Sequence, residues 1–250
     1  MEAQSVRLYL AGGTTRDCAL LLGADGKRSV VRAAAGINVQ ISPYGHTAIV
    51  ANFSCERPHD AVAQQWFTHE GVVALLPLPG NHVSLVWSAP PALAAELQNL
   101  APDDFARRVA LRSAHALGAL KMLGERHAFV LEQLVVERMV RPGVALLGDA
   151  AHVVHPLAGQ GLNLGLQDVA QLLQVLSARE AWRDPGDLVL LRRHERARAE
   201  PVGMMRLTVN SLARLFGTPD PAVRWVRNRG LDWVQMASPL KNLLIRRAIG

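Results

Sequence analysis

Short blocks of apolar and alternating residues fill the first part of the chain, and this texture predicts strands. Between about residues 40 and 140 the pattern predicts an antiparallel sheet, with strands at 46–55, 61–67, 71–78, 82–88 and 129–140. Pro79-Gly80-Asn81 has the composition of a hairpin turn. The Ala- and Leu-rich segment 91–118 predicts one or two helices.

The two ends of the chain have α/β character. Residues 4–10 predict a strand that is followed by a Gly12-Gly13 turn, and the apolar run 18–22 predicts a strand buried on both faces. Residues 29–35 are compatible with a helix that stops at Gly36. A second buried strand is expected at 143–147. Helical periodicity follows Gly159, and one apolar face is expected from five residues: Leu162, Leu166, Val169, Leu172 and Leu173.

The charge is concentrated toward the carboxyl end. Residues 192–250 carry 12 Lys and Arg against 4 Asp and Glu, a net charge of +8, whereas the whole chain carries +6. Such asymmetry can indicate nucleic acid, an anionic membrane or an acidic partner. The basic residues are spaced among Leu, Val and Trp at helical intervals, which favours a solvated helix face and gives no support for nucleic-acid binding.

Composition indicates a protein of a reducing compartment. Only Cys18 and Cys55 are present, with no CxxC pairing, so neither a disulfide framework nor a thiolate metal site is expected. No apolar run approaches the ~20 residues that cross a bilayer. The first residues lack the basic and apolar regions of a secretory signal. We therefore expect a cytoplasmic location.

The stretch 148–163 carries the strongest chemical signal. Asp149 follows a buried strand, at the end where ligands bind in open α/β sheets, and its carboxylate can accept hydrogen bonds from polyol hydroxyls. Pro156 lies in the following loop, and Gly159 and Gly161 open a helix whose free N–H groups favour an anionic ring. A bare GxG would be explained by turn geometry alone, but the whole constellation favours a bound cofactor.

Residues Gly148–Asn163 resemble the flavin-contacting signature of the group A flavoprotein hydroxylases, the para-hydroxybenzoate hydroxylase superfamily. Residues Gly23–Arg32, which read GADGKRSVVR, resemble the Asp-Gly fingerprint of that superfamily. The two motifs stand in the family order, roughly 120 residues apart. The resemblance implies FAD as cofactor and NAD(P)H as co-substrate.

The resemblance also implies roles for individual residues. Asp149 would bind the ribityl chain, Asp25 the ribityl or pyrophosphate portion, and Arg32 would help to handle the cofactor and NAD(P)H. Leu157 and Ala158 would line the substrate side, together with the sheet around residues 64–76. The full set of expected cofactor-binding residues is Asp25, Gly26, Ser29, Arg32, Gly148, Asp149, Pro156, Gly159, Gln160, Gly161, Leu162 and Asn163.

Further stretches resemble the ubiquinone-biosynthesis hydroxylases within that superfamily. They are residues 67–78, 83–88, 210–216, 226–231 and 239–250. This resemblance implies a monooxygenase that hydroxylates a polyprenyl phenol ring with NAD(P)H and O2. The flavin would carry the oxygen chemistry, so no side-chain nucleophile is required, and we identify no base for the phenol.

One departure from the family lies at the front, where the GxGxxG segment that holds the ADP pyrophosphate is absent. We therefore expect an amino-terminally truncated chain with an α/β fold and an α+β insert. An incomplete Rossmann-like FAD-binding domain would be formed by residues 1–38 and 141–180. Residues 39–140 would form the antiparallel-sheet substrate domain, and 181–250 a helical region.

Three interpretations remain open at this stage. The chain is a hydroxylase that needs its missing segment, a non-catalytic remnant or accessory protein that binds prenylphenols or a partner enzyme, or another aromatic hydroxylase or flavin halogenase of the same fold. The spacing of His152 and His155 invites a metal site, but without further ligands we expect no metal. An amphipathic end, Leu240-Lys241 to Arg246-Arg247, predicts helix packing or contact with the inner membrane or a biosynthetic complex.

Overall fold

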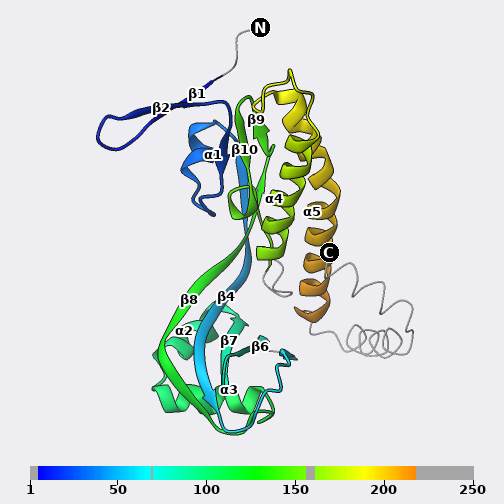
Figure 1. Cartoon of the computed structure of the whole chain (residues 1–250). Coiled ribbons are helices and arrows are strands. Elements are labelled where there is room, and N and C mark those ends of the chain that lie inside the picture. Colours follow the sequence, from blue (N-terminus) through cyan, green and yellow to red (C-terminus); the bar gives the residue numbers. More distant parts are fainter. Residues whose placement is uncertain (1–4, 69, 156–160, 218–250) are drawn as a thin grey trace, which may run out of the picture. The chain divides into compact units, whose positions relative to one another are not determined.

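The computed structural model describes residues 5–68, 70–155 and 161–217, and of 212–217 the backbone alone. The contacts divide the chain into two compact units. The first unit comprises Met1–Ala48, Pro90–Ala94 and Ala128–Asn210. The second unit comprises Ile49–Ala89, Ala95–His127 and Ser211–Gly250. Two strands of 17 residues, β4 (Val39–Cys55) and β8 (Leu120–Val136), contribute residues to both units (Figure 1).

The first unit contains a three-stranded sheet with β10 (Val144–Leu146) at its centre. On one side β10 pairs in parallel with β3 (Leu21–Gly23), and on the other it pairs antiparallel with β9 (Val140–Arg141). All three residues of β10 are buried, as the apolar run 143–147 predicts. The parallel pair makes this the α/β part of the fold.

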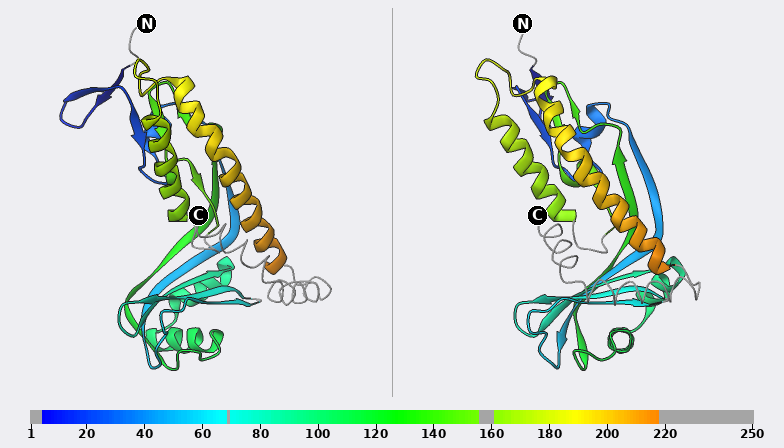
Figure 2. Two further views of the ribbon diagram at one scale, coloured as in Figure 1. Left: turned by 45° about the vertical axis from the view of Figure 1, so that its right-hand side comes forward. Right: turned by 90° about the vertical axis from the view of Figure 1, so that its right-hand side faces the viewer.

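The described part of the first unit contains two complete helices, most of a third, and the first residues of a fourth, α2 (Pro91–Asn99). Helix α1 (Val30–Ala34) follows β3 and is capped by Ser29, where the sequence predicts a helix over 29–35. Helix α4 (Gly161–Ser177) and the first part of α5 (Leu188–Gly217) lie side by side in Figures 1 and 2. Pro185 and Gly186 lie between these two helices.

The amino-terminal strands differ from the expectation. Residues 18–22 do not form one strand buried on both faces. Instead, β2 (Thr15–Cys18) ends a hairpin with β1 (Val6–Tyr9), and β3 begins at Leu21 after a break. Within the described residues β3 pairs with β10 alone, so its outer edge is unpaired and Leu22 is 44% exposed. Apolarity identified the strand, but its neighbours decided its burial.

The larger sheet has six strands in the order β11-β8-β4-β7-β6-β5. The predicted antiparallel meander is confirmed in β6 (Gly71–Leu78) and β7 (His82–Ala89), with the turn at Gly80 in the left-handed region. Its first strand, predicted at 61–67, is β5 (Gln64–Thr68), which starts three residues later than expected. Strand β11 (His152–Val153) pairs antiparallel with β8. The predicted strand 129–140 is wrong in its limits. Strand β8 starts at Leu120 and ends at Val136, and a separate strand, β9, begins at Val140.

The segment 91–118 forms two helices, α2 (Pro91–Asn99) and α3 (Pro102–Arg112). Pro102 starts α3, and Asp103 and Asp104 complement the dipole of its first turn. Phe105 of α3 is fully buried, with its ring centroid 5.8 Å from that of Phe53. These contacts build the core of the second unit.

The apolar stripe of α4 does not form the buried face that its pattern predicts. Leu162, Leu166, Val169 and Leu173 are all at least half exposed, whereas Leu172 is buried. The buried face carries Leu164, Asp168 and Leu172 instead. It packs on the turn after β10, where Gly165 allows close approach: a Cβ on Gly165 would lie 3.3 Å from the Gly148 Cα. Backbone proximity and a charged contact therefore decide which face is covered.

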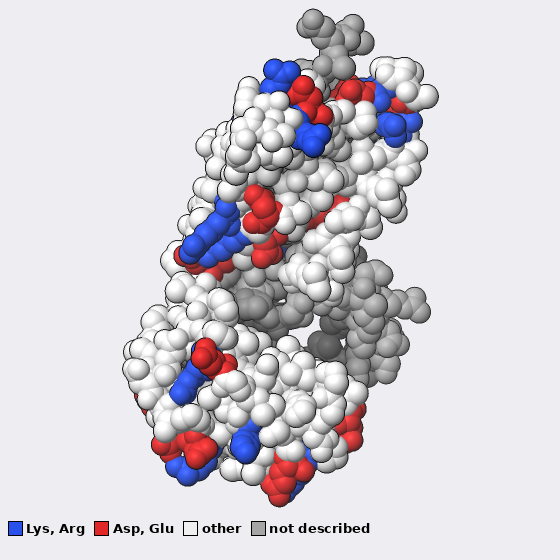
Figure 3. All heavy atoms as spheres, turned by 60° about the vertical axis from the view of Figure 1, so that its left-hand side comes forward, with Lys and Arg blue, Asp and Glu red and all other residues white. Residues whose placement is uncertain are grey.

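Charged side chains do not gather by sign on the face shown in Figure 3, where basic and acidic residues lie next to one another. Half of the net charge of +8 on residues 192–250 falls within 218–250, outside the described residues, as do the stretches 226–231 and 239–250.

Candidate cofactor site

The two predicted cofactor motifs begin at the same edge of the small parallel sheet. Gly23 is the last residue of β3 and pairs with Leu146 of β10. The Leu147 N–H donates to the Gly23 carbonyl at 2.9 Å. The loop Ala24–Ser29 and the turn at Gly148 therefore both leave the carboxyl ends of neighbouring parallel strands. Ligands of open α/β sheets bind at this edge.

Arg32 connects the two motifs. Its side chain is buried, and its guanidinium donates to the Ala150 carbonyl at 2.9 Å and to the Lys27 carbonyl at 2.7 Å. One side chain thus fastens the Asp-Gly loop to the turn that follows β10, across 118 positions of sequence. The sequence predicts Arg32 as a cofactor residue; the structure shows a side chain committed to two backbone carbonyls.

Asp25 holds the start of α1. One oxygen of its exposed carboxylate accepts the Val30 N–H at 2.7 Å and the Val31 N–H at 3.1 Å. Partial burial raises the pKa of Asp25, but hydrogen bonds from Ser29 and from these N–H groups outweigh burial and lower it. Ser29 caps the helix by accepting the Arg32 N–H at 2.9 Å. Gly26 supplies the turn between them, with φ of +79°.

Asp149 lies in a 3-10 turn, η1 (Gly148–Ala150), directly after β10. Gly148 has φ of +56°, a left-handed conformation that favours glycine. The Asp149 side chain is exposed and makes no hydrogen bond to any residue that the structure describes. The turn therefore presents a free carboxylate at the ligand-binding edge of the sheet.

A buried carboxylate, Asp168 of α4, supports this turn. Its Oδ2 accepts the Gly148 N–H at 2.8 Å and lies 2.8 Å from His152 Nε2, while its Oδ1 accepts from Arg198 Nε at 2.6 Å. Burial raises the pKa of Asp168, but His152, the Gly148 N–H and Arg198 together lower it. Sequence reasoning missed Asp168 and Arg198; the only signal was an acidic residue inside an apolar helix.

A second polar cluster adjoins His155 through Tyr44. The Tyr44 hydroxyl lies 3.0 Å from Asn210 Oδ1 and 3.3 Å from Gln133 Oε1, and Asn210 Nδ2 donates to Gln133 at 2.8 Å. The Tyr44 ring meets the buried His155 ring edge-on, with centroids 4.6 Å apart. Burial, and secondly the charge of His46, lower the pKa of His155 to about 4. These residues were not singled out from the sequence as cofactor or substrate residues.

The two histidines that invited a metal hypothesis face different partners. His152 is engaged by Asp168, whereas His155 packs on Tyr44. The described residues contain no group of three or more His, Cys, Asp or Glu that could hold a metal ion.

The remaining predicted cofactor residues fall at the start of α4. Gly161 begins the helix, Leu162 is exposed, and a Cβ built on Gly161 would meet no atom within 4 Å. Asn163 also lies in this first turn. Five predicted residues lie outside the described part of the chain: Pro156, Leu157, Ala158, Gly159 and Gln160.

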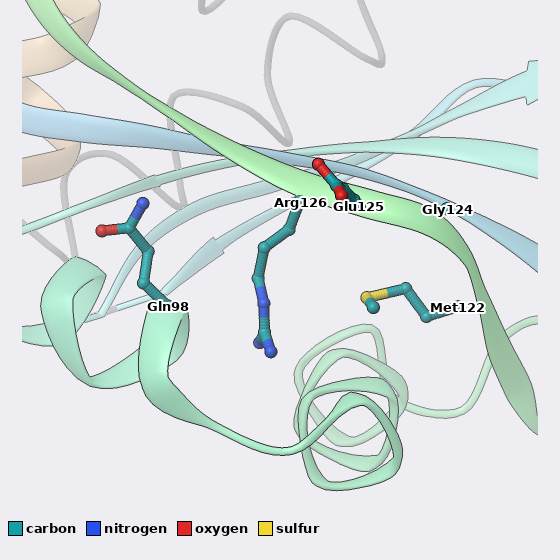
Figure 4. A pocket seen from close by; sticks show the side chains of 5 residues that line it. All are labelled: Gln98, Met122, Gly124, Glu125 and Arg126. Carbon is teal, nitrogen blue, oxygen red and sulfur yellow. The ribbon is translucent and has the colours of Figure 1, made fainter.

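The second unit carries a hollow of about 350 Å³ lined by Gln98, Met122, Gly124, Glu125 and Arg126 (Figure 4). The Arg126 guanidinium donates to the Leu97 and Leu100 carbonyls and lies over the Phe105 ring. The guanidinium thus satisfies carbonyls at the carboxyl end of α2 rather than facing a ligand.

Within the predicted substrate sheet, Phe67 and Leu76 are each about 40% exposed. No described helix is long and apolar enough to cross a membrane.

Comparison with known proteins places this geometry in a family. A family model for the FAD binding domain matches residues 2–204. The chain is 38% identical over its whole length to ubiquinone hydroxylase UbiL of Rhodospirillum rubrum, covering 58% of that protein. It is 37% identical over 97% of its length to 3-demethoxyubiquinol 3-hydroxylase of Escherichia coli, covering 62% of it.

Among solved structures, PqsL of Pseudomonas aeruginosa in complex with 2-aminobenzoylacetate superposes with a TM-score of 0.74. It is 27% identical, and the match covers 84% of this chain and 59% of PqsL. The chain thus spans about three fifths of the length of the relatives it matches. Because the family model covers more than half of the chain, this protein belongs to the FAD binding domain family.

Proposed function

We propose that this chain forms the flavin-ring and substrate part of an FAD-dependent monooxygenase that hydroxylates a polyprenyl phenol in ubiquinone biosynthesis. One observation carries the proposal: the two flavin motifs leave adjacent parallel strands at one edge and are joined there by Arg32. The named relatives, a ubiquinone hydroxylase and 3-demethoxyubiquinol 3-hydroxylase, support the substrate class.

The residues at this edge suit a flavin. The free Asp149 carboxylate can accept hydrogen bonds from ribityl hydroxyls. Gly161 leaves open space at the first turn of α4, where the helix dipole favours the electron-rich edge of the ring. The proposed cofactor residues remain Asp25, Gly26, Ser29, Arg32, Gly148, Asp149, Pro156 and Gly159–Asn163.

When bound, the flavin supplies the oxygen-transfer chemistry, with NAD(P)H as reductant and O2 as oxygen source. The protein's part is to orient the ring and keep water out. Asp149 holds the ribityl chain, while Asp25 and Arg32 keep the neighbouring loop in place from below. The burial of Arg32 favours this supporting role over direct contact with NAD(P)H. Leu157 and Ala158 are proposed to line the substrate side.

The proposal is tested in the source organism by deleting the gene and analysing its quinones by mass spectrometry. We expect an under-hydroxylated quinone precursor to accumulate, and the intact gene to restore the normal pool. Restoration should be weaker with Asp149→Ala and complete with Glu96→Ala, which removes an exposed carboxylate on α2. A normal quinone pool in the deletion strain would contradict the function.

We also propose that the basic, amphipathic carboxyl end contacts the inner membrane, where a polyprenylated substrate resides. The support is sequence alone: Leu240, Leu243 and Leu244 lie close in sequence to Lys241, Arg246 and Arg247. Sedimentation with phosphatidylglycerol vesicles should be strong at low salt and lost at high salt, with no binding to phosphatidylcholine vesicles. Replacing Lys241, Arg246 and Arg247 by Gln should abolish it; equal binding by that variant would refute the contact.

A further inference from the structure

A cluster of buried charges lies in the first unit, behind the turn that follows β10. Asp168 of α4 is completely buried, and Arg198 of α5 and His152 of β11 are nearly so. Burying an ionised carboxylate is unfavourable unless it is paired and hydrogen-bonded, so such a group calls for an explanation. Here three elements each contribute one member, and all three meet at the Asp168 side chain.

The Asp168 carboxylate divides its contacts between two tasks. Its Oδ1 accepts from Arg198 Nε at 2.6 Å, and Arg198 also donates to the Leu164 carbonyl at 3.2 Å, which holds the guanidinium on α4. Its Oδ2 accepts the Gly148 N–H and lies equally close, at 2.8 Å, to His152 Nε2. Arg198 and His152 therefore fix the carboxylate, and the carboxylate fixes one backbone N–H of the turn.

That N–H belongs to Gly148, whose backbone conformation sets the direction of the neighbouring Asp149 side chain. Gly148 is left-handed, and Gly165, three positions before Asp168 on α4, packs against its Cα. The turn is thus held from one side by a charge-assisted hydrogen bond and by close packing. Nothing described holds the Asp149 side chain itself, so its direction depends on the backbone of the turn.

We propose that Asp168 is a positioning residue for the cofactor: through the Gly148 N–H it sets the turn that points the Asp149 carboxylate at the ribityl chain. This inference rests on the proposed function, because it assumes that Asp149 meets the flavin. Asp168, His152 and Arg198 would thus affect flavin binding through the turn, without contacting the flavin.

The test compares two flavins that differ only in the chain that Asp149 should bind. Riboflavin carries a ribityl chain with its hydroxyls on N10, whereas lumiflavin has a methyl group in place of the whole chain. Binding of each to the 250-residue protein is measured by fluorescence titration. The parent should prefer riboflavin roughly tenfold, the size of one charge-assisted hydrogen bond, and Asp149→Ala should lose that preference.

Asp168→Asn should lose the riboflavin preference as Asp149→Ala does, with lumiflavin affinity unchanged within about twofold. The double variant should show no further loss, because both changes remove one interaction. Leu190→Ala, which opens a cavity at a fully buried position of α5, is the control: it should lower stability but keep the preference. A positional role and a merely structural one are thereby separated.

Three results would overturn the inference. If Asp149→Ala removes the preference and Asp168→Asn keeps it, Asp168 is structural and the proposed function survives. If the parent shows no preference, the Asp149 assignment fails and this inference with it. If hydrogen exchange of the Gly148 amide is no faster in Asp168→Asn than in the parent, the turn is not held by Asp168. Should Asp168→Asn not fold, Asp168→Glu keeps the charge for Arg198 while displacing the carboxylate, and the same losses are expected.

Discussion

Asp25 and Asp149 occupy equivalent places after neighbouring parallel strands, yet their carboxylates are used differently. Asp25 accepts two backbone N–H groups at the start of α1, whereas Asp149 makes no hydrogen bond to the described residues. The first motif is stabilised by its own side chains. The second is stabilised from behind, by Asp168 and Arg32, and leaves its acidic side chain free.

This difference teaches how one edge of a sheet can be both rigid and available. A side chain that satisfies the backbone of its own loop has little left to offer a ligand. A loop whose backbone is satisfied by other elements can keep its own carboxylate for a ligand. Both motifs lie within the residues that the family model matches, but we expect them to respond differently to mutation.

The largest effect is expected from Arg32, which belongs to the first motif and contacts the second. Arg32→Leu removes two charged hydrogen bonds to backbone carbonyls, one buried and one partly buried, and we expect a loss of roughly 3 kcal/mol in the free energy of unfolding. Urea denaturation measures it. Arg28→Leu, at an exposed position of the same loop, should change stability by less than about 0.5 kcal/mol. Equal effects of the two changes would show that Arg32 does not join the motifs.

Asp149→Ala should weaken flavin binding without weakening the fold. We expect the loss of one charge-assisted hydrogen bond, about 1.5–3 kcal/mol, or a Kd for FAD that rises roughly tenfold to a hundredfold. Titration followed by flavin fluorescence measures this rise, and Glu96→Ala serves as the matched exposed carboxylate. Unaltered flavin retention would show that the ribityl chain lies elsewhere.

The second motif, 148–163, should also make the stability of the protein depend on pH, because it contains His155. The pKa of His155 is about 4 in the folded protein and 6.5 in its ordinary state, so protons bind preferentially to the unfolded chain. Stability is therefore complete above pH 6.5 and falls as the pH drops from 6.5 toward 4, by up to about 1.4 kcal/mol per pH unit.

Replacement by a residue that does not titrate isolates this contribution. His155→Gln should flatten the dependence of unfolding free energy on pH between 4 and 6.5. Burial also lowers the pKa of His194, which contributes with the same sign and remains in the variant. An identical slope in parent and variant would assign the whole effect to other groups.

The smallest effect is expected from Asp25. Asp25→Ala leaves two N–H groups at an exposed helix start, and we expect a loss of about 1 kcal/mol in stability, as for other helix caps. Urea denaturation of this variant beside Asp149→Ala sharpens the comparison directly. If Asp149→Ala is the more destabilising of the two, the proposed contrast is wrong, because it holds that Asp25 stabilises its own loop and that Asp149 does not.

Local signals predicted much of the fold. Ser29 followed by an apolar segment located α1, and Pro79-Gly80-Asn81 located the β6–β7 turn, because capping and turn preferences act over a few residues. The limits of β8 and the burial of β3 were predicted wrongly. Both depend on which strands lie alongside, and a single apolar run cannot reveal that.

By itself the sequence located the two motifs that are predicted to contact flavin, their order, and the strand and helix that flank each. These follow from short-range patterns and from resemblance. Tertiary structure decided that Gly23 and Gly148 share an edge, that Arg32 joins them, and that Asp168 rather than the leucine stripe of α4 faces inward. The reason is physical: a buried charge is stable only where partners from other elements meet it, and those partners lie 16 to 30 residues away in sequence.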